Sequence, residues 1–183
     1  MNIMDTSEKD FESQIEDYLT KNGYIKRTNE NFEAKPALDA EILFEFLETT
    51  QPKTWEKLKK QHGNQIKEKF FNRLIKEIEN RGTLDILRKG VTDLGCKFDL
   101  AYFKPIDTLN PEHQQLYNQN KLTIMRQVCF EEKADNQAKS SQPESIDKAD
   151  NQSTERQNKS IDTVIFLNGL PIFTIELKNP LPN

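Results

Sequence analysis

Hydrophobic residues recur at helical intervals in the first half of the chain. Phe11, Ile15 and Leu19 lie four residues apart, which places them on one face of an amphipathic helix, and Gly23 follows where such a helix would end. The same reasoning predicts further helices along this half. The predicted helices span residues 8–22, residues 38–48, a short segment beginning near Pro52, and residues 64–80.

The pattern changes to alternation in the second half. Apolar and polar residues alternate along four segments, and alternation is typical of strands. The predicted strands span residues 96–105, 122–130, 161–167 and 172–177. Asn168 and Gly169 lie between the last two, and Asn-Gly between apolar runs is a strong hairpin signal. Residues 111–120 are expected to form a short helix or a loop. Helices followed by strands predict an α/β fold, of the α+β kind, with a mixed sheet flanked by helices.

A polar stretch at residues 131–160 interrupts this order. It contains no aromatic residue, and residues 133–147 and 148–162 are two copies of one segment with nine of fifteen positions identical. A stacked repeat needs a hydrophobic face that these copies lack, so we expect a duplicated, disordered linker inserted before the hairpin. Both copies end in Ser-Ile-Asp, but Asp147 leads into no structured segment, whereas Asp162 enters a predicted strand.

Composition limits the function classes. The 183 residues are 34% hydrophobic and 31% charged with a net charge of −4, which allows one domain with a modest core. No window is apolar enough for a membrane span, and no signal peptide precedes the domain, so a cytoplasmic protein is expected. Cys96 and Cys129 are too few for a disulfide framework or a zinc site, and both are expected to be buried thiols. His62 and His113 are too few for a histidine-rich metal site.

Candidate chemistry lies in the predicted hairpin. Glu176 and Lys178 are two residues apart on one predicted strand and therefore share a face, while Asp162 lies on the preceding strand. Both strands look largely buried, and a buried Glu and Lys are costly unless they are paired or functional. Two converging carboxylates can bind Mg²⁺, which activates water and offsets phosphodiester charge. Lys178 could orient or deprotonate that water. From the spacing alone, solvated strand residues remain the alternative.

The register of the hairpin tests this hypothesis. In an antiparallel pair, opposite residues share a face and their numbers have a constant sum. A two-residue loop gives a sum of 337 and turns Glu176 away from Asp162, whereas a sum of 338 pairs them directly. We therefore predict a three-residue loop or a β-bulge within the hairpin.

The run SIDTVIFLNGLPIFTIELKNP at residues 160–180 resembles the nuclease motif of the restriction (R) subunit of type I restriction-modification enzymes. Other segments are similar to the same family, and together they cover about residues 5–130 and 160–183. These segments are FESQIEDYLTKNGY at 11–24, TQPKTWEKL at 50–58, RGTLDILRKG at 81–90, FDLAYFKP at 98–105 and NQNKLTIMRQVCF at 118–130.

The resemblance implies a PD-(D/E)xK fold and Mg²⁺-dependent cleavage of double-stranded DNA, with methylation and specificity subunits as partners. By position, Asp162 and Glu176 would bind the metal and Lys178 would complete the active centre. An acidic residue on the first helix assists some related nucleases, so Glu8 or Glu12 could match, with an exposed helix carboxylate as the alternative. ATP would act only through a motor domain that this chain lacks, because no Gly-Lys-Ser/Thr triplet occurs.

The resemblance also implies that residues 1–183 form a partial nuclease domain, because the family's R subunit is several times longer and continues beyond the ExK strand. The alternative to a nuclease is a truncated non-catalytic remnant or docking module of that subunit. A second pair of alternatives concerns the basic residues of the central helices, which fit either a solvated helix face or a contact to the DNA backbone. They are Lys53, Lys57, Lys59, Lys60, Lys67, Lys69, Arg73 and Lys76.

Overall fold

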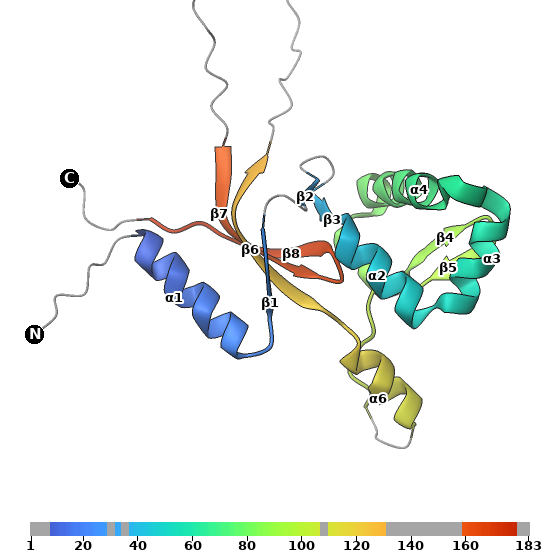
Figure 1. The fold of residues 1–183 in the computed structure, drawn as a ribbon, viewed down its shortest axis with the longest axis horizontal. Coiled ribbons are helices and arrows are strands. Elements are labelled where there is room, and N and C mark those ends of the chain that lie inside the picture. The colour runs from blue at the N-terminus through green and yellow to red at the C-terminus, as the bar shows by residue number, and fades with distance from the viewer. Residues whose placement is uncertain (1–7, 29–31, 34–36, 107–109, 131–158, 179–183) are drawn as a thin grey trace, which may run out of the picture.

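A computed structural model describes residues 8–28, 32–33, 37–106, 110–130 and 159–178. Two lobes lie side by side (Figure 1). The sheet lobe consists of α1 (Glu8–Lys21), β1 (Ile25–Arg27), β6 (Leu122–Phe130), β7 (Lys159–Leu167) and β8 (Leu170–Ile175). The helical lobe consists of α2 (Ala40–Thr50), α3 (Pro52–His62), the 3-10 helix η2 (Gly63–Gln65), α4 (Ile66–Arg81), α5 (Thr83–Lys89), β4 (Val91–Asp93) and β5 (Cys96–Phe98). The remaining elements are β2 (Phe32–Glu33), β3 (Leu38–Asp39) and α6 (Pro111–Asn118).

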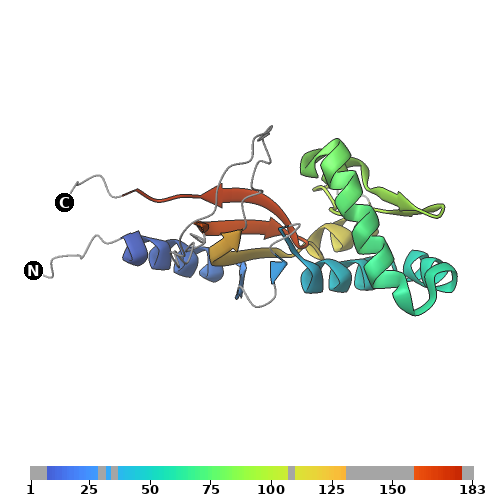
Figure 2. The ribbon, with the colours of Figure 1, turned by 90° about the horizontal axis from the view of Figure 1, so that it is seen from above.

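The central sheet is mixed. Its strand order is β1-β6-β7-β8, with β1 parallel to β6 and the other neighbours antiparallel. Helix α1 lies along one side of these strands (Figure 2). The predicted mixed sheet with flanking helices is thus confirmed. No helix in the described part of the chain is long and apolar enough to cross a membrane.

The predicted helices form because their apolar positions meet in a common core. Phe46, Leu58 and Leu74, from α2, α3 and α4, are almost completely buried. Helix α2 begins at a cap in which the Asp39 side chain accepts a hydrogen bond from the backbone of Ile42 at 3.2 Å. Helix α4 ends at Gly82, whose φ of 78° stops the helix.

One predicted strand is shorter than expected. Alternation continues from residue 96 to residue 105, but β5 ends at Phe98. The Gln51 side chain accepts a hydrogen bond from the Asp99 backbone N–H at 2.9 Å and donates one to its carbonyl at 2.8 Å. A side-chain amide therefore takes the place of a neighbouring strand at the point where β5 ends.

The two cysteines lie in different environments. Cys96 is buried in the core of the helical lobe, as predicted, but Cys129 is exposed, so that part of the prediction is wrong. The reason is the length of the neighbouring strands. β1 pairs with β6 only as far as Met125, and β8 pairs with β7 only as far as Thr163, so the β6–β7 end that carries Cys129 has no flanking strand.

The predicted linker at residues 131–160 lies mostly outside the described residues. Its last two residues belong to β7, which begins at Lys159 rather than at Ile161. These two residues pair with the end of β6, since Lys159 lies opposite Phe130. The strand that carries Asp162 is therefore present and two residues longer than predicted.

Candidate functional site

The turn of the β7–β8 hairpin is buried, and its polar groups are held by the surrounding chain. Asn168 has a φ of 52° and Gly169 a φ of 85°, which is the left-handed backbone that a two-residue Asn-Gly turn requires. The Asn168 side chain accepts from the Lys121 backbone at 2.7 Å and donates to the Leu100 carbonyl and the Asn120 side chain, each at 2.9 Å. These bonds fix the turn in one orientation.

Gly169 fixes the hairpin against the helical lobe. Its carbonyl accepts a hydrogen bond from the Asp39 backbone at 2.9 Å, at the start of α2. A Cβ atom at this position would lie 2.4 Å from the Asp39 carbonyl oxygen and 2.9 Å from the Leu43 nitrogen. Only glycine permits this approach, so the turn is where the two lobes are joined.

The register of the hairpin contains the predicted β-bulge. In the two pairs nearest the turn the residue numbers add to 337, and in the three pairs from Ile165 back to Thr163 they add to 338. Ile172 is therefore an extra residue on β8. The last pair of this second register is Thr163 with Ile175. If the register continued by one more residue, Glu176 would lie opposite Asp162. The prediction of a three-residue loop or a β-bulge is confirmed, and the bulge is the form that occurs.

Asp162 is half-buried and oriented by the chain that follows β8. Its Oδ2 accepts a hydrogen bond from the Leu177 backbone N–H at 2.6 Å. Leu177 is the residue between Glu176 and Lys178, so this bond holds the backbone of the Glu-x-Lys segment next to Asp162. A charge-assisted bond of this kind is among the stronger hydrogen bonds in proteins.

Two expectations about this segment are wrong. Glu176 and Lys178 follow the end of β8 instead of lying on it, and both are exposed rather than buried. The reason is that β8 is the edge strand of the sheet, and its outer residues are uncovered. Ile172 and Phe173 on the same strand are also 44% and 59% exposed. Because they are exposed, Glu176 and Lys178 carry no burial cost that a function or a partner would have to offset.

The residues present fit Mg²⁺ only as a two-carboxylate site. Within the described ranges, no group of three or more His, Cys, Asp or Glu side chains could hold a metal ion. Mg²⁺ is commonly bound in proteins through one or two carboxylates while it retains several waters. Asp162 and Glu176 supply two carboxylates, and one Asp162 oxygen is already engaged by Leu177.

A second charged cluster, which the sequence did not predict, lies between α1 and the sheet. Glu12 and Glu16 are only 2% and 5% exposed, although they sit on a helix at the edge of the lobe. Arg126 of β6 bonds to Glu12 at 2.8 Å and lies 3.5 Å from Glu16, and Lys26 of β1 bonds to Glu16 at 2.8 Å. Burial alone would lower the pKa of Arg126, but the hydrogen bond and charge of Glu12, with the charge of Glu16, raise it above its usual value.

This cluster shifts the buried face of α1 from the predicted one, because Glu12 and Glu16 are buried while Ile15 and Leu19 are only half-buried. The helix forms at the predicted residues, but Phe11 and Tyr18 are 54% and 68% exposed. An exposed carboxylate is therefore excluded for Glu12, while Glu8 is exposed. The available sequence signal was Arg126, a charged residue on an apolar strand face that requires acidic partners.

Gln127 links the charged cluster to the hairpin. It lies between the pairs Arg126–Thr163 and Val128–Ile161 and therefore faces the Asp162 position across the strands. Its φ of 51° breaks the regular strand, and its side chain donates to Glu12 at 2.8 Å. Glu12 is thus connected through one side chain to the strand position opposite Asp162.

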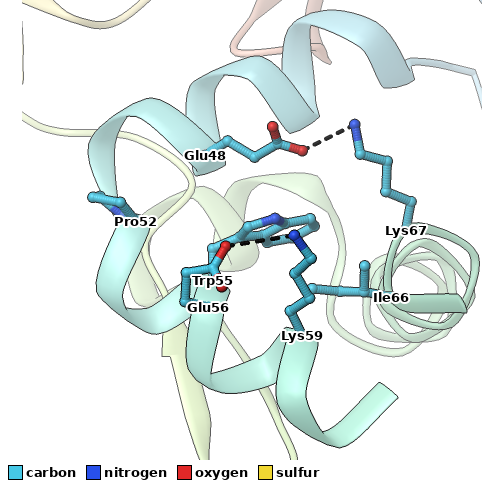
Figure 3. Close-up of a pocket in the computed structure, with 7 residues that line it drawn as sticks. All are labelled: Glu48, Pro52, Trp55, Glu56, Lys59, Ile66 and Lys67. Carbon is cyan, nitrogen blue, oxygen red and sulfur yellow. Dashed lines mark ion pairs between the residues drawn. The ribbon is translucent and has the colours of Figure 1, made fainter. Parts of the chain in front are cut away.

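A pocket lies elsewhere, between α2, α3 and α4 (Figure 3). Its volume is about 460 Å³. Trp55 and Ile66 form its apolar part, and two ion pairs lie at its rim: Glu48 with Lys67 at 2.9 Å, and Glu56 with Lys59 at 3.7 Å. None of the predicted site residues lines this pocket.

The fold and the hairpin together define a mixed α/β protein in which Asp162 lies on β7 and Glu176 directly follows β8. The chain belongs to the family described as the type I restriction enzyme R protein N terminus, whose family model matches residues 5–183. This confirms the resemblance found in the sequence. No curated protein and no solved structure matches the chain.

Proposed function

We propose that this chain is the nuclease part of a type I restriction enzyme R subunit and that it hydrolyses phosphodiester bonds of double-stranded DNA with Mg²⁺. The proposal includes a PD-(D/E)xK fold and action within a complex that contains methylation and specificity subunits. The observation that supports it is the bulge at Ile172, because it sets Ile175 opposite Thr163, a register that would bring Glu176 opposite Asp162 if it continued by one residue.

Each residue of the site has a role in this proposal. Asp162 and Glu176 would hold Mg²⁺, and the Leu177 N–H keeps the Asp162 carboxylate in place. When bound, Mg²⁺ supplies an acidified water and offsets the charge of the scissile phosphate. Lys178 is exposed and has no ion pair with a described residue, so its ammonium can approach the phosphate and stabilise negative charge that develops there.

The test compares single substitutions in the full chain. Mg²⁺ and Mn²⁺ binding is measured by calorimetry, and cleavage is measured on duplex DNA. We expect Asp162→Ala and Glu176→Ala to abolish both, and Lys178→Ala to keep metal binding but lose cleavage.

The duplication provides a matched control. Asp147 ends the first Ser-Ile-Asp copy as Asp162 ends the second, although Asp147 lies outside the described residues. Asp147→Ala should leave metal binding and cleavage unchanged. Equal losses at both positions would contradict the assignment of Asp162.

A second candidate function is a docking module of the same subunit that does not cut DNA. The exposure of Glu176 and Lys178, and the lack of a three-carboxylate group among the described residues, favour it. The same titration decides between the two. If the unaltered chain binds neither metal, and the triple substitution Asp162→Ala, Glu176→Ala and Lys178→Ala changes nothing measurable, the docking function is supported.

A further inference from the structure

Positive charge is concentrated in one part of this acidic chain. Residues 51–89, which contain α3, α4 and α5, include eleven Lys and Arg against five Asp and Glu, a net charge of +6. The whole chain has a net charge of −4. The rest of the molecule is therefore strongly acidic, and the helical lobe carries a local excess of cations that can attract a polyanion.

Helix α3 arranges three of these cations in a line. Lys53, Lys57 and Lys60 are four and three residues apart, so they share one face of the helix. Trp55 and Leu58 of the same helix are buried on the side toward the core, and all three lysines are exposed. We call these three lysines the α3 stripe.

No ion pair joins the lysines of the α3 stripe to an acidic side chain within the described residues, and the same is true of Lys69 and Lys76 on α4. By contrast, Lys59 pairs with Glu56, Lys67 with Glu48 and Lys89 with Asp85, as Figure 3 shows for the first two pairs.

Like charges three or four residues apart on a helix repel one another and destabilise it. The α3 stripe therefore carries an electrostatic cost that an external anion would relieve.

We propose that the α3 stripe binds the phosphate backbone of duplex DNA without reading its sequence, at a place separate from the β7–β8 hairpin. The identity of the polyanion rests on the proposed function. The stripe spans eight residues, and the seven steps from Lys53 to Lys60 rise about 10 Å along the helix. Phosphates follow one another every ~3.4 Å of duplex axis on each strand, so this length matches about three phosphate steps. Lysine ammonium groups neutralise phosphates as point charges and carry no base specificity.

The experiment removes equal charge at two places in the full chain. One variant carries Lys53→Gln, Lys57→Gln and Lys60→Gln. The control variant carries Lys59→Gln, Lys67→Gln and Lys89→Gln, which removes three paired lysines of the same lobe. Binding to a fluorescent 30-base-pair duplex is measured by anisotropy over a range of salt concentrations with EDTA present, so that cleavage plays no part.

We expect the stripe variant to bind roughly tenfold or more weakly at low salt. Its plot of log affinity against log salt concentration should be shallower by about three, because each lost phosphate contact changes the slope by about 0.9. In the control variant, both the affinity at low salt and the slope against salt concentration should change much less. Replacing the three stripe lysines by arginine keeps the charge and should retain binding.

Three results would overturn the inference: equal effects of the two triple variants, no duplex binding by the unaltered chain, or tighter binding of the stripe to an acidic polypeptide such as polyglutamate than to DNA. Asp162→Ala is measured alongside them. If that variant binds DNA normally and the unaltered chain never cleaves, the stripe holds while the proposed nuclease function fails. The two ideas can therefore fail separately.

Discussion

The two lobes are stabilised by different interactions. Within the described residues, the helical lobe is built on a cluster of eighteen buried residues, in which Phe70 and Phe98 pack edge to face with ring centres 4.9 Å apart. The sheet lobe has a cluster of only four, and much of its interior consists of charged groups around Arg126. The candidate site thus lies in the lobe that relies least on apolar packing.

The sheet lobe also contains polar groups without partners. In the described part of the chain, the hydroxyls of Thr123 and Thr163 are buried with no hydrogen bond. Thr163 is adjacent to Asp162 and opposite Ile175 in the hairpin. A buried hydroxyl without a partner costs free energy, which a stable scaffold elsewhere must offset. The apolar core of the helical lobe therefore offsets the free-energy cost of the charged and polar groups that are buried in the sheet lobe.

The largest loss of stability is expected from Phe70→Ala, which weakens the core of the helical lobe. Phe70 is completely buried and contacts both Trp55 and Phe98, so its removal leaves a cavity in the aromatic core. We expect the free energy of unfolding to fall by about 3–5 kcal/mol. Urea denaturation followed by fluorescence of Trp55, the single tryptophan, reports on this lobe directly. A loss below about 1 kcal/mol would mean that the helical lobe is not the dominant source of stability.

A smaller effect is expected from Arg126→Met, which removes the cation from the charged cluster and leaves Glu12 and Glu16 facing each other. Breaking a buried ion pair from one side costs about 3–5 kcal/mol. The Arg126 side chain is 25% exposed, so we expect about 2 kcal/mol. Hydrogen exchange should show that backbone amides of β6 and α1 lose protection, while amides of the helical lobe keep theirs.

The control for Arg126→Met is the triple variant that adds Glu12→Gln and Glu16→Gln. With the buried carboxylates neutralised, part of the lost stability should return. If the triple variant is as unstable as Arg126→Met alone, the arginine contributes through packing rather than charge. The sheet lobe would then resemble the helical lobe more closely than its contacts suggest.

Periodicity was sufficient to predict the long elements. Four helices and the strands β6, β7 and β8 follow from spacing, because each presents several apolar side chains to a core. It could not predict β1, β4 or α5, since strands of three residues and a helix of seven show no measurable period. It also missed that the buried face of α1 includes two carboxylates, because their partner, Arg126, lies more than a hundred residues away.

The candidate site was predicted in part. Register arithmetic required a bulge in the hairpin, and Ile172 supplies it. The exposure of Glu176 and Lys178 could not be predicted, because an apolar strand sequence does not reveal whether the strand lies inside a sheet or at its edge. The link from Glu12 through Gln127 to the Asp162 position depends on a left-handed residue within a strand, which no local pattern indicates.

The smallest effect is expected from Asp162→Asn, which tests whether Asp162 is structural or functional. The asparagine carbonyl can still accept the Leu177 N–H, and the change removes one negative charge next to Glu176. Without metal, the free energy of unfolding should therefore change by no more than about 0.5 kcal/mol and could rise slightly. Asp162→Ala removes the acceptor as well and should cost about 1 kcal/mol.

Without metal the Asp162→Asn variant should be as stable as the unaltered chain or slightly more stable. With Mg²⁺ present, the unaltered chain should be the more stable of the two. A ligand that binds only the folded chain stabilises it in proportion to the logarithm of its concentration above Kd, so the unaltered chain should gain stability and the variant should not. Thermal unfolding with Mg²⁺ and with EDTA measures both. A loss of several kcal/mol in EDTA would instead assign Asp162 a structural role. In that case the carboxylate would belong with Arg126 among the groups that hold the sheet lobe together.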